Sequence, residues 1–159
     1  MSKKTAYLGL FSAVAIIFGY VESLIPIFAG IPGIKLGLAN LAVLFILERY
    51  SWKEAAMVST VRILVIGFLF GNLFSIVYSL AGAAFSLLVM TILKKQEGFS
   101  LTGISIAGGV SHNVGQLLAA VAIVENLSLL YYAPVLLVSG VVTGLLIGLL
   151  TAETAKRIP

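Results

Sequence analysis

The chain alternates between long apolar stretches and short polar clusters. Most of the apolar stretches are about as long as a helix that crosses a lipid bilayer, which needs about 20 residues. The polar clusters lie around residues 48–54, 94–100 and 125–131. We therefore predict six membrane-spanning helices, which cover residues 5–26, 34–47, 52–71, 72–93, 101–124 and 132–151.

Breaks in the apolar pattern fix the bounds of three of these predicted helices. Residues 52–93 form one apolar run that is too long for a single crossing, and the turn dipeptide Gly71-Asn72 divides it. The helix at 34–47 is the shortest and contains Lys35 and Asn40. It follows the connection at 26–33, where glycines and prolines favour a non-helical backbone.

Composition places these helices in lipid. The chain is 60% hydrophobic and 10% charged, with a mean hydropathy of +1.15, whereas soluble domains are about a quarter charged. We expect an all-α integral membrane protein with a single transmembrane domain over residues 1–159. The basic start before residue 5 resembles a signal peptide, but the apolar run is too long and lacks a cleavage site, so we expect a retained first helix.

The basic residues predict an orientation, because cytoplasmic loops of membrane proteins collect Lys and Arg. If both termini are cytoplasmic, the connections on the other side hold at most Lys35, and Arg62 lies within a helix. The remaining eight bases fall in cytoplasmic segments: Lys3, Lys4, Arg49, Lys53, Lys94, Lys95, Lys156 and Arg157. We expect a multi-pass protein of the cell membrane with both ends inside.

Polar residues within the predicted helices gather toward one side. At about 1.5 Å of rise per residue, Arg62 and His112 lie near the midplane, with Asn113 and Gln116 at the midplane or just outward of it. The others fall in the outer half or at the outer surface: Glu22, Lys35, Asn40, Asn72, Ser75, Tyr78, Glu125 and Asn126. Because polar groups in a membrane are costly unless they face a cavity or partner, the pattern predicts a polar cavity open to the outside.

We predict that seven residues bind a substrate in this cavity: Lys35, Asn40, Arg62, Tyr78, His112, Asn113 and Gln116. Three of them, at 112, 113 and 116, share one face of a helix. The positive charges favour an anionic or amphipathic ligand. We expect Glu22 to act as a lid or gate.

Structural roles stay open for several of these residues. Arg62 is alternatively a structural charge satisfied by carbonyls or by Glu22, and His112 a hydrogen-bonded interior histidine. Lys35 is alternatively a side chain that reaches the interface, and Glu22 a helix-end charge.

The chain contains no cysteine and no aspartate. The sequence lacks a P-loop, the usual zinc constellations and a nucleophile elbow, so we predict no catalytic residue, no metal and no cofactor. No polybasic stripe indicates nucleic-acid binding. We expect a protein that is not an enzyme, and a stand-alone membrane enzyme is a minor alternative.

Small residues recur every fourth position in two predicted helices, as is typical of close helix contacts in membranes. One stripe is Gly103, Ala107, Ser111, Gly115 and Ala119, and the other is Gly140, Gly144 and Gly148. We expect them to pack inside one bundle, and a partner-facing surface is the alternative.

Three strings carry a family resemblance: PGIKLGLAN at 32–40, the stretch 62–71, and GGVSHNVGQ at 108–116. They resemble the Gx transporter family, often labelled heptaprenyl diphosphate synthase component I, over nearly the whole chain. That family is distantly similar to the substrate-binding S components of energy-coupling-factor transporters. The similarity implies that the connection at 26–33 acts as a lid, and that Gly9 and Ala13 contact a membrane coupling subunit driven by ATPases.

Two functions follow as hypotheses. The first is a membrane-embedded substrate-binding subunit of an importer, for a small amphipathic or anionic molecule related to a vitamin, an isoprenoid or a quinone. The second is a non-catalytic membrane accessory component of a polyprenyl diphosphate or quinone pathway, because a chain without aspartate lacks the metal-binding carboxylates of prenyl synthesis. The expected partners are a small-molecule substrate, membrane lipid, and a coupling subunit with its ATPases.

Overall fold

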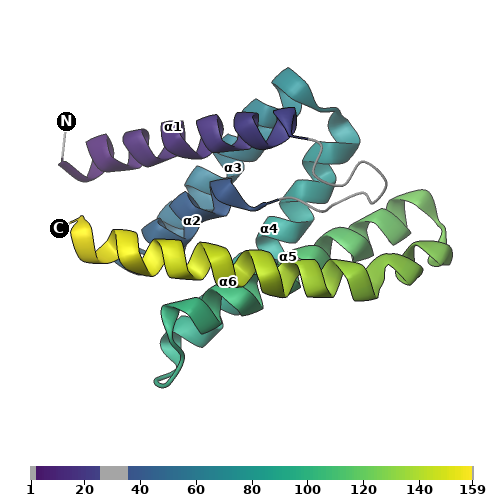
Figure 1. Ribbon diagram of the computed structural model, residues 1–159. Coiled ribbons are helices and arrows are strands. Elements are labelled where there is room, and N and C mark those ends of the chain that lie inside the picture. Colours follow the sequence, from purple (N-terminus) through teal and green to yellow (C-terminus); the bar gives the residue numbers. More distant parts are fainter. Residues whose placement is uncertain (1–2, 26–35, 159) are drawn as a thin grey trace.

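Six α-helices make up most of the computed structural model, which describes residues 3–25 and 36–158 (Figure 1). They are α1 (Lys3–Leu24), α2 (Leu38–Arg49), α3 (Trp52–Phe70), α4 (Leu73–Lys95), α5 (Leu101–Val124) and α6 (Ala133–Arg157). A short 3-10 helix, η1 (Leu127–Tyr132), precedes α6. No strand occurs in the described ranges, which confirms the all-α class.

The helix boundaries follow from local hydrogen bonds. The predicted break between α3 and α4 is confirmed: Asn72 accepts a hydrogen bond from the Ser75 amide at 2.8 Å, and Ser75 accepts one from the Asn72 amide at 2.9 Å. This reciprocal pair satisfies two amide groups that the first turn of a helix leaves open. At the start of α5, Ser100 likewise accepts from the Gly103 amide at 3.1 Å.

Two helices have bounds that differ clearly from those of the predicted membrane spans. The structure begins α2 at Leu38, after Gly37 in the left-handed conformation (φ 75°), whereas the sequence pattern placed the start at 34. The structure extends α6 to Arg157, six residues past the predicted end at 151. Glu153 accounts for part of that extension, because it accepts a hydrogen bond from Arg157 at 2.8 Å one turn later.

Four helical segments are long and apolar enough to cross a membrane: α1, α4, α5, and η1 together with α6. With 12 residues, α2 is about 18 Å long, short of the roughly 30 Å of a bilayer core. The 19-residue α3 carries Lys53, Glu54 and Arg62. The chain is therefore a multi-pass membrane protein, and the count of six full crossings stays a prediction.

The helices form a closed ring. Packing runs from α1 to α3, α4, α5, α6 and α2, and α2 closes the ring against α1. Both chain ends lie at one end of the bundle, here called the terminal end, and the last turn of α1 and the connection from α5 to α6 lie at the opposite, distal end (Figure 1). Which end faces the cytoplasm remains a prediction.

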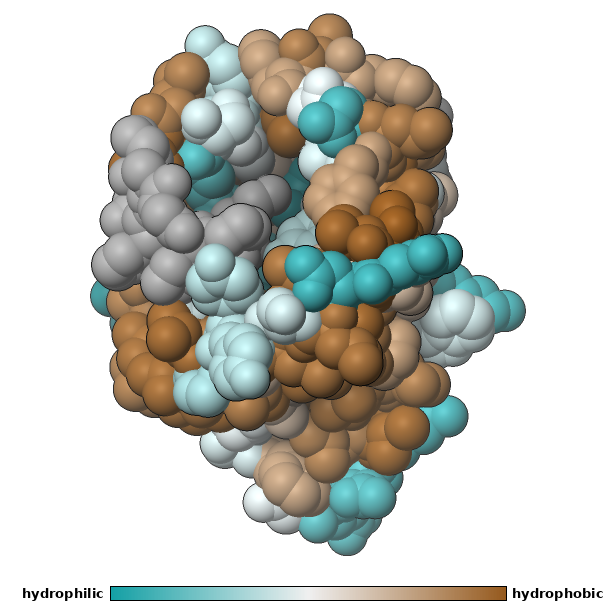
Figure 2. All heavy atoms as spheres, turned by 90° about the vertical axis from the view of Figure 1, so that its right-hand side faces the viewer, coloured by the Kyte–Doolittle hydropathy of each residue, from teal (hydrophilic) through white to brown (hydrophobic). Residues whose placement is uncertain are grey.

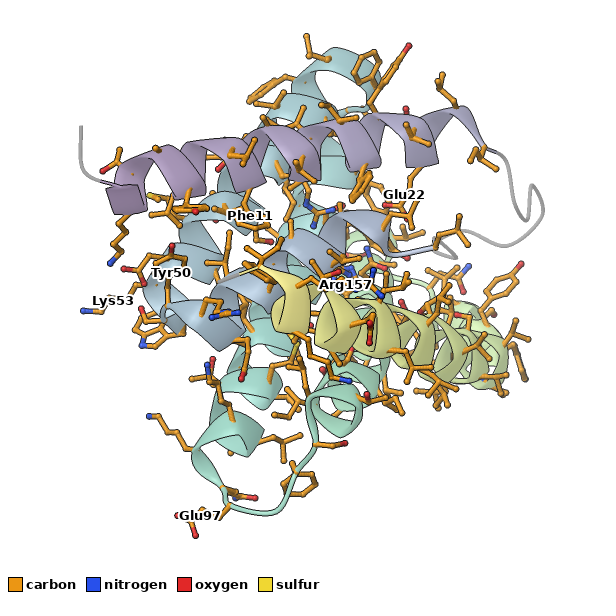
Figure 3. All side chains as sticks on the ribbon, turned by 60° about the vertical axis from the view of Figure 1, so that its left-hand side comes forward. Phe11, Glu22, Tyr50, Lys53, Glu97 and Arg157 are labelled. Atoms are coloured by element: carbon orange, nitrogen blue, oxygen red, sulfur yellow. The ribbon has the colours of Figure 1, made fainter. Side chains whose placement is uncertain are left out.

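The short α2 contacts α1, α3 and α6 and is the most buried of the helices. Its residues from Ala42 to Leu47 are all buried, as expected of a helix that is apolar all round. Phe45 stacks on Phe11 of α1 with ring centroids 4.5 Å apart. Figure 3 shows Phe11 on the side of α1 that faces α2. At its terminal end, the Glu48 carbonyl accepts a hydrogen bond from Lys94 at 2.7 Å. Neighbouring helices therefore enclose α2, and its short length is compatible with a place inside the membrane.

The glycine stripe of α6 packs against α5. A Cβ added at Gly144 would lie 2.7 Å from Ile106 Cα, and one added at Gly148 would lie 2.7 Å from Thr102 Cα. Only glycine permits backbones to approach this closely. These contacts confirm for α6 the prediction that the stripe packs inside the bundle.

The predicted stripe of α5 also packs inside the bundle at one of its glycines. Gly115 faces α4, where an added Cβ would lie 2.9 Å from both the Ala81 carbonyl and Phe85 Cβ. The α5 positions that meet the α6 glycines are Thr102, Ile106 and their neighbours. Because α5 lies between α4 and α6, its small residues serve two interfaces.

Candidate functional site: a polar cavity inside the ring

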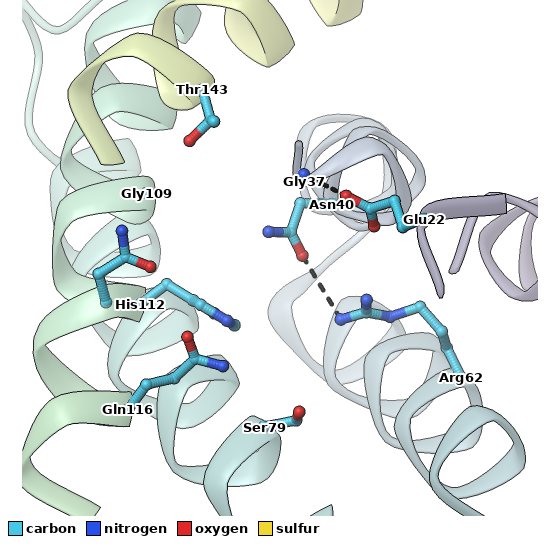
Figure 4. A pocket seen from close by; sticks show the side chains of 10 residues that line it. Glu22, Gly37, Asn40, Arg62, Ser79, Gly109, His112, Gln116 and Thr143 are labelled. Carbon is cyan, nitrogen blue, oxygen red and sulfur yellow. Dashed lines mark hydrogen bonds between the residues drawn. The ribbon is translucent and has the colours of Figure 1, made fainter. Parts of the chain in front are cut away.

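Each of the six helices contributes at least one residue to one polar cavity (Figure 4). About 490 Å³ of space lies within it, including its opening to solvent. The lining residues are Glu22, Gly37, Asn40, Arg62, Ser79, Gly109, His112, Asn113, Gln116 and Thr143. The cavity is polar although the surrounding bundle is mostly apolar.

The cavity lies toward the distal end. Glu22 is in the last turn of α1, Gly37 directly precedes α2, and Ser79 is in the first third of α4. In Figure 2, which looks from the right-hand side of Figure 1, hydrophilic atoms are set back among hydrophobic ones beside the grey segment. The polar groups therefore share one cavity in one half of the bundle, as the sequence pattern predicts.

Arg62 is the cation of the cavity. Its Nη2 atom donates a hydrogen bond to Asn40 Oδ1 at 3.5 Å (Figure 4). Its Nε atom is buried and has no hydrogen-bond partner among the described residues. No ion pair within the described ranges includes Arg62, although Glu22 attracts it electrostatically. A guanidinium ion paired so weakly in an apolar bundle is costly, and a bound anion would offset that cost.

His112 and Gln116 enter the cavity from α5. They are one helical turn apart, and both point toward the space that Arg62 enters from α3 (Figure 4). Gln116 is 2% exposed, and no described residue forms a hydrogen bond with its amide. Buried amides normally find hydrogen-bond partners, so the Gln116 amide is available for a ligand or water.

Gly82 of α4 provides the room for these two side chains. A Cβ added there would lie 2.6 Å from Gln116 Cγ and 3.0 Å from His112 Cε1. A larger residue at this position would displace them. Gly82 is therefore a positioning residue of the cavity that the sequence pattern did not single out.

Asn113 has a structural task as well. Its Nδ2 atom donates hydrogen bonds to the Leu136 carbonyl at 2.6 Å and to Ser139 Oγ at 3.2 Å, both on α6. These bonds tie α5 to α6 beside the cavity. The Nδ2 group of Asn113 is thus already hydrogen-bonded to the protein, in contrast with the amide of Gln116.

Glu22 joins the cavity to the start of α2. Its Oε1 atom accepts hydrogen bonds from the Gly37 amide at 2.5 Å and the Leu38 amide at 3.2 Å. These amides belong to the start of α2, where Gly37 provides no capping side chain. The structure thus supports the helix-end reading of Glu22, and its role as a lid or gate stays a prediction.

The cavity brings together most, but not all, of the predicted binding residues. Tyr78 is not among its lining residues and stacks on Phe74 at 5.7 Å between ring centroids. Lys35 and the predicted lid at 26–33 lie outside the described residues. Gly9 and Ala13, the predicted partner contacts, are exposed on α1.

Four lining residues were not predicted: Gly37, Ser79, Gly109 and Thr143. The glycines lie within the strings PGIKLGLAN and GGVSHNVGQ, and this position could have indicated that they belong to the site. Ser79 and Thr143 are single hydroxyl residues within apolar helices. Such residues usually satisfy themselves on their own helix, as Thr143 does by donating to the Ser139 carbonyl at 2.8 Å, and the sequence does not distinguish them from others of that kind.

The described residues hold no group of three or more His, Cys, Asp or Glu side chains suited to a metal ion. The donors and acceptors of the cavity are a guanidinium group, amides, an imidazole, hydroxyls and one carboxylate. This set suits the binding of a polar or anionic organic molecule.

A family model described as heptaprenyl diphosphate synthase component I matches residues 11–154. The match covers all six α-helices in whole or in part, and with them the cavity. The chain belongs to this family. No curated protein and no solved structure matches the chain.

Proposed function

We propose that the protein is a membrane-embedded binding subunit that captures a small anionic or amphipathic molecule from the distal side, as the substrate-binding subunit of an importer. One observation carries the proposal: inside a ring of six helices, the Arg62 guanidinium and the Gln116 amide face a shared cavity with unused hydrogen-bonding capacity. Arginine is well suited to carboxylates and phosphates because its donors match their geometry.

The remaining steps of transport fall to partners. The distal end faces outside in the orientation that the basic residues predict. The exposed positions Gly9 and Ala13 on α1 would contact a membrane coupling subunit, and associated ATPases would supply energy for inward release. The chain itself would bind and present the substrate.

Binding of an anionic probe tests the site. The purified protein is placed in nanodiscs of zwitterionic lipid, and its affinities for n-butyl phosphate and n-butyrate are measured, with empty nanodiscs as the blank. We expect at least one probe to bind, and Arg62→Gln to weaken it at least tenfold. The matched control is Arg157→Gln, because Arg157 is exposed at the terminal end and pairs with Glu153 at 2.8 Å. Failure of both probes to bind, or equal binding by the Arg62 variant, contradicts the proposal.

A second function is favoured by the family description. A component of a prenyl diphosphate synthase implies a partner component, and the protein would then be a non-catalytic membrane accessory of that enzyme. Membranes from cells with and without the protein would be compared for heptaprenyl diphosphate synthesis. Unchanged synthesis favours the importer subunit. If synthesis is lost without the protein and Arg62→Gln protein restores it, the accessory role is favoured.

A further inference from the structure

A second hollow adjoins the polar cavity. About 330 Å³ of space lies within it, including space open to solvent, and it shares Gly37, Asn40, Gly109 and Thr143 with the first. Its own lining is formed by apolar and small residues: Leu44, Ser86, Met90, Ser105, Gly108, Gly144 and Ile147. Among these residues no charged side chain occurs, so the lining changes from charged and polar to mainly apolar.

The second hollow extends toward the terminal end. Met90 lies about three helical turns beyond Ser79 along α4, which runs toward that end. Ile147 lies one turn beyond Thr143 on α6, which runs the same way. Met90 is 6% exposed and Ile147 is 3% exposed. The two hollows therefore adjoin along four shared lining residues, with the cation of the first toward the distal end and the more apolar hollow deeper in the bundle.

We infer that the second hollow holds the apolar tail of the ligand whose anionic head lies at Arg62. The ligand class is a single-tailed amphiphile with a short hydrocarbon tail that points toward the terminal end. This inference rests on the proposed function and adds the chemistry and orientation of the substrate. Each methylene group removed from water raises affinity about fourfold, so the tail would contribute strongly until it exceeds the hollow.

The test compares n-butyl phosphate with n-octyl phosphate in the same nanodiscs, again corrected for partitioning into empty ones. Wild-type protein should bind the octyl compound at least tenfold more tightly. Gly108→Ala should reduce this preference about threefold or more and leave n-butyl phosphate binding unchanged. The reason is that its new Cβ would lie 2.5 Å from Met90 Sδ, and the flexible Met90 side chain would have to move within the hollow.

The matched control is Gly103→Ala on the same helix, where the nearest atom to a new Cβ is Ser100 Oγ at 3.4 Å. It should keep the wild-type preference for the longer tail. Met90→Phe is the second variant, because it adds bulk to the same wall without changing the backbone of α5. It should also reduce the preference.

The outcomes separate the two proposals. If neither phosphate binds, the anion site fails and the tail site fails with it. If both bind with equal affinity, or if both hollow-filling variants keep the full preference, the anion site stands and the tail inference is overturned. Competition by phosphatidylglycerol would identify the site as one for lipid headgroups and would also overturn the inference.

Discussion

Glu22 and Gly37 are joined by a hydrogen bond from the Gly37 amide to Glu22 Oε1, so that a carboxylate on α1 caps the start of α2. The same carboxylate lines the polar cavity and attracts Arg62. One side chain in the last turn of α1 therefore holds the start of α2. A change in the charge around Arg62 would therefore alter the hydrogen bonds that Glu22 accepts at the start of α2.

Loss of this cap should loosen the first turn of α2. We expect Glu22→Ala to speed amide hydrogen exchange at Gly37 and Leu38. The free energy of opening the first turn of α2 should fall by about 1 kcal/mol, the usual contribution of a helix cap. Glu22→Gln keeps an acceptor oxygen and should have a smaller effect. Exchange measured by mass spectrometry on peptides from this region tests the prediction. Unchanged exchange in the alanine variant would show that the cap is unimportant in the membrane.

Gly144 should tolerate no side chain. Gly144→Ala would place a Cβ 2.7 Å from Ile106 Cα and 2.8 Å from the Ser105 carbonyl. We expect it to destabilise the protein by about 1–3 kcal/mol, the usual cost of overpacking. The matched control is Gly9→Ala, because an added Cβ there meets nothing within 4 Å. Thermal unfolding in detergent measures both, and equal melting temperatures would contradict the tight contact of α5 with α6.

Asn113 and Gln116 should respond in opposite ways to loss of their amides. Asn113→Leu removes the hydrogen bonds to Leu136 and Ser139 and should lower stability by about 1–3 kcal/mol. Gln116→Met replaces an amide that has no described partner with a side chain of similar shape. It should leave stability unchanged or raise it, and should weaken binding of n-butyl phosphate. If Gln116→Met destabilised the protein as much as Asn113→Leu, the Gln116 amide would be structural.

The connections on either side of α5 should lie on opposite sides of the membrane. The sequence contains no cysteine, so single cysteines report without background. We expect Glu97→Cys, between α4 and α5, to react with an impermeant maleimide only from the cytoplasmic side. Asn126→Cys, directly before η1, should react only from outside. Reaction of both from the same side would exclude the predicted orientation.

Much of the fold could be predicted because apolar length and turn chemistry act locally. The Gly71-Asn72 break and the start of α5 at Leu101 follow from residues beside them in the chain. The late start of α2 could not be predicted, since its cap comes from Glu22, fifteen residues earlier. Likewise, the enclosed position of α2 depends on three other helices rather than on its own pattern.

Part of the site could be predicted because burying a polar side chain in the membrane costs free energy, so such residues indicate a site. Arg62, His112 and Gln116 stand out because such polar side chains are costly within apolar membrane helices. Tyr78 carries a polar group too, but the face of α4 that meets the cavity is the one with Ser79. Helix rotation depends on packing, and the contacts of Gly82 and Gly115 that set it for α4 appear only in three dimensions.

Water access to Ser79 tests the central claim most directly. Ser79→Cys would be exposed to an impermeant thiosulfonate reagent added outside right-side-out vesicles, with and without n-butyl phosphate. The control is Ala84→Cys, an exposed position on the same helix that we expect to face lipid. We predict that the cysteine at position 79 reacts from outside and is protected by the phosphate, whereas the one at 84 stays unmodified. Reaction at 79 only from the cytoplasmic side, or no reaction from either side, would contradict a ligand cavity open at the distal end.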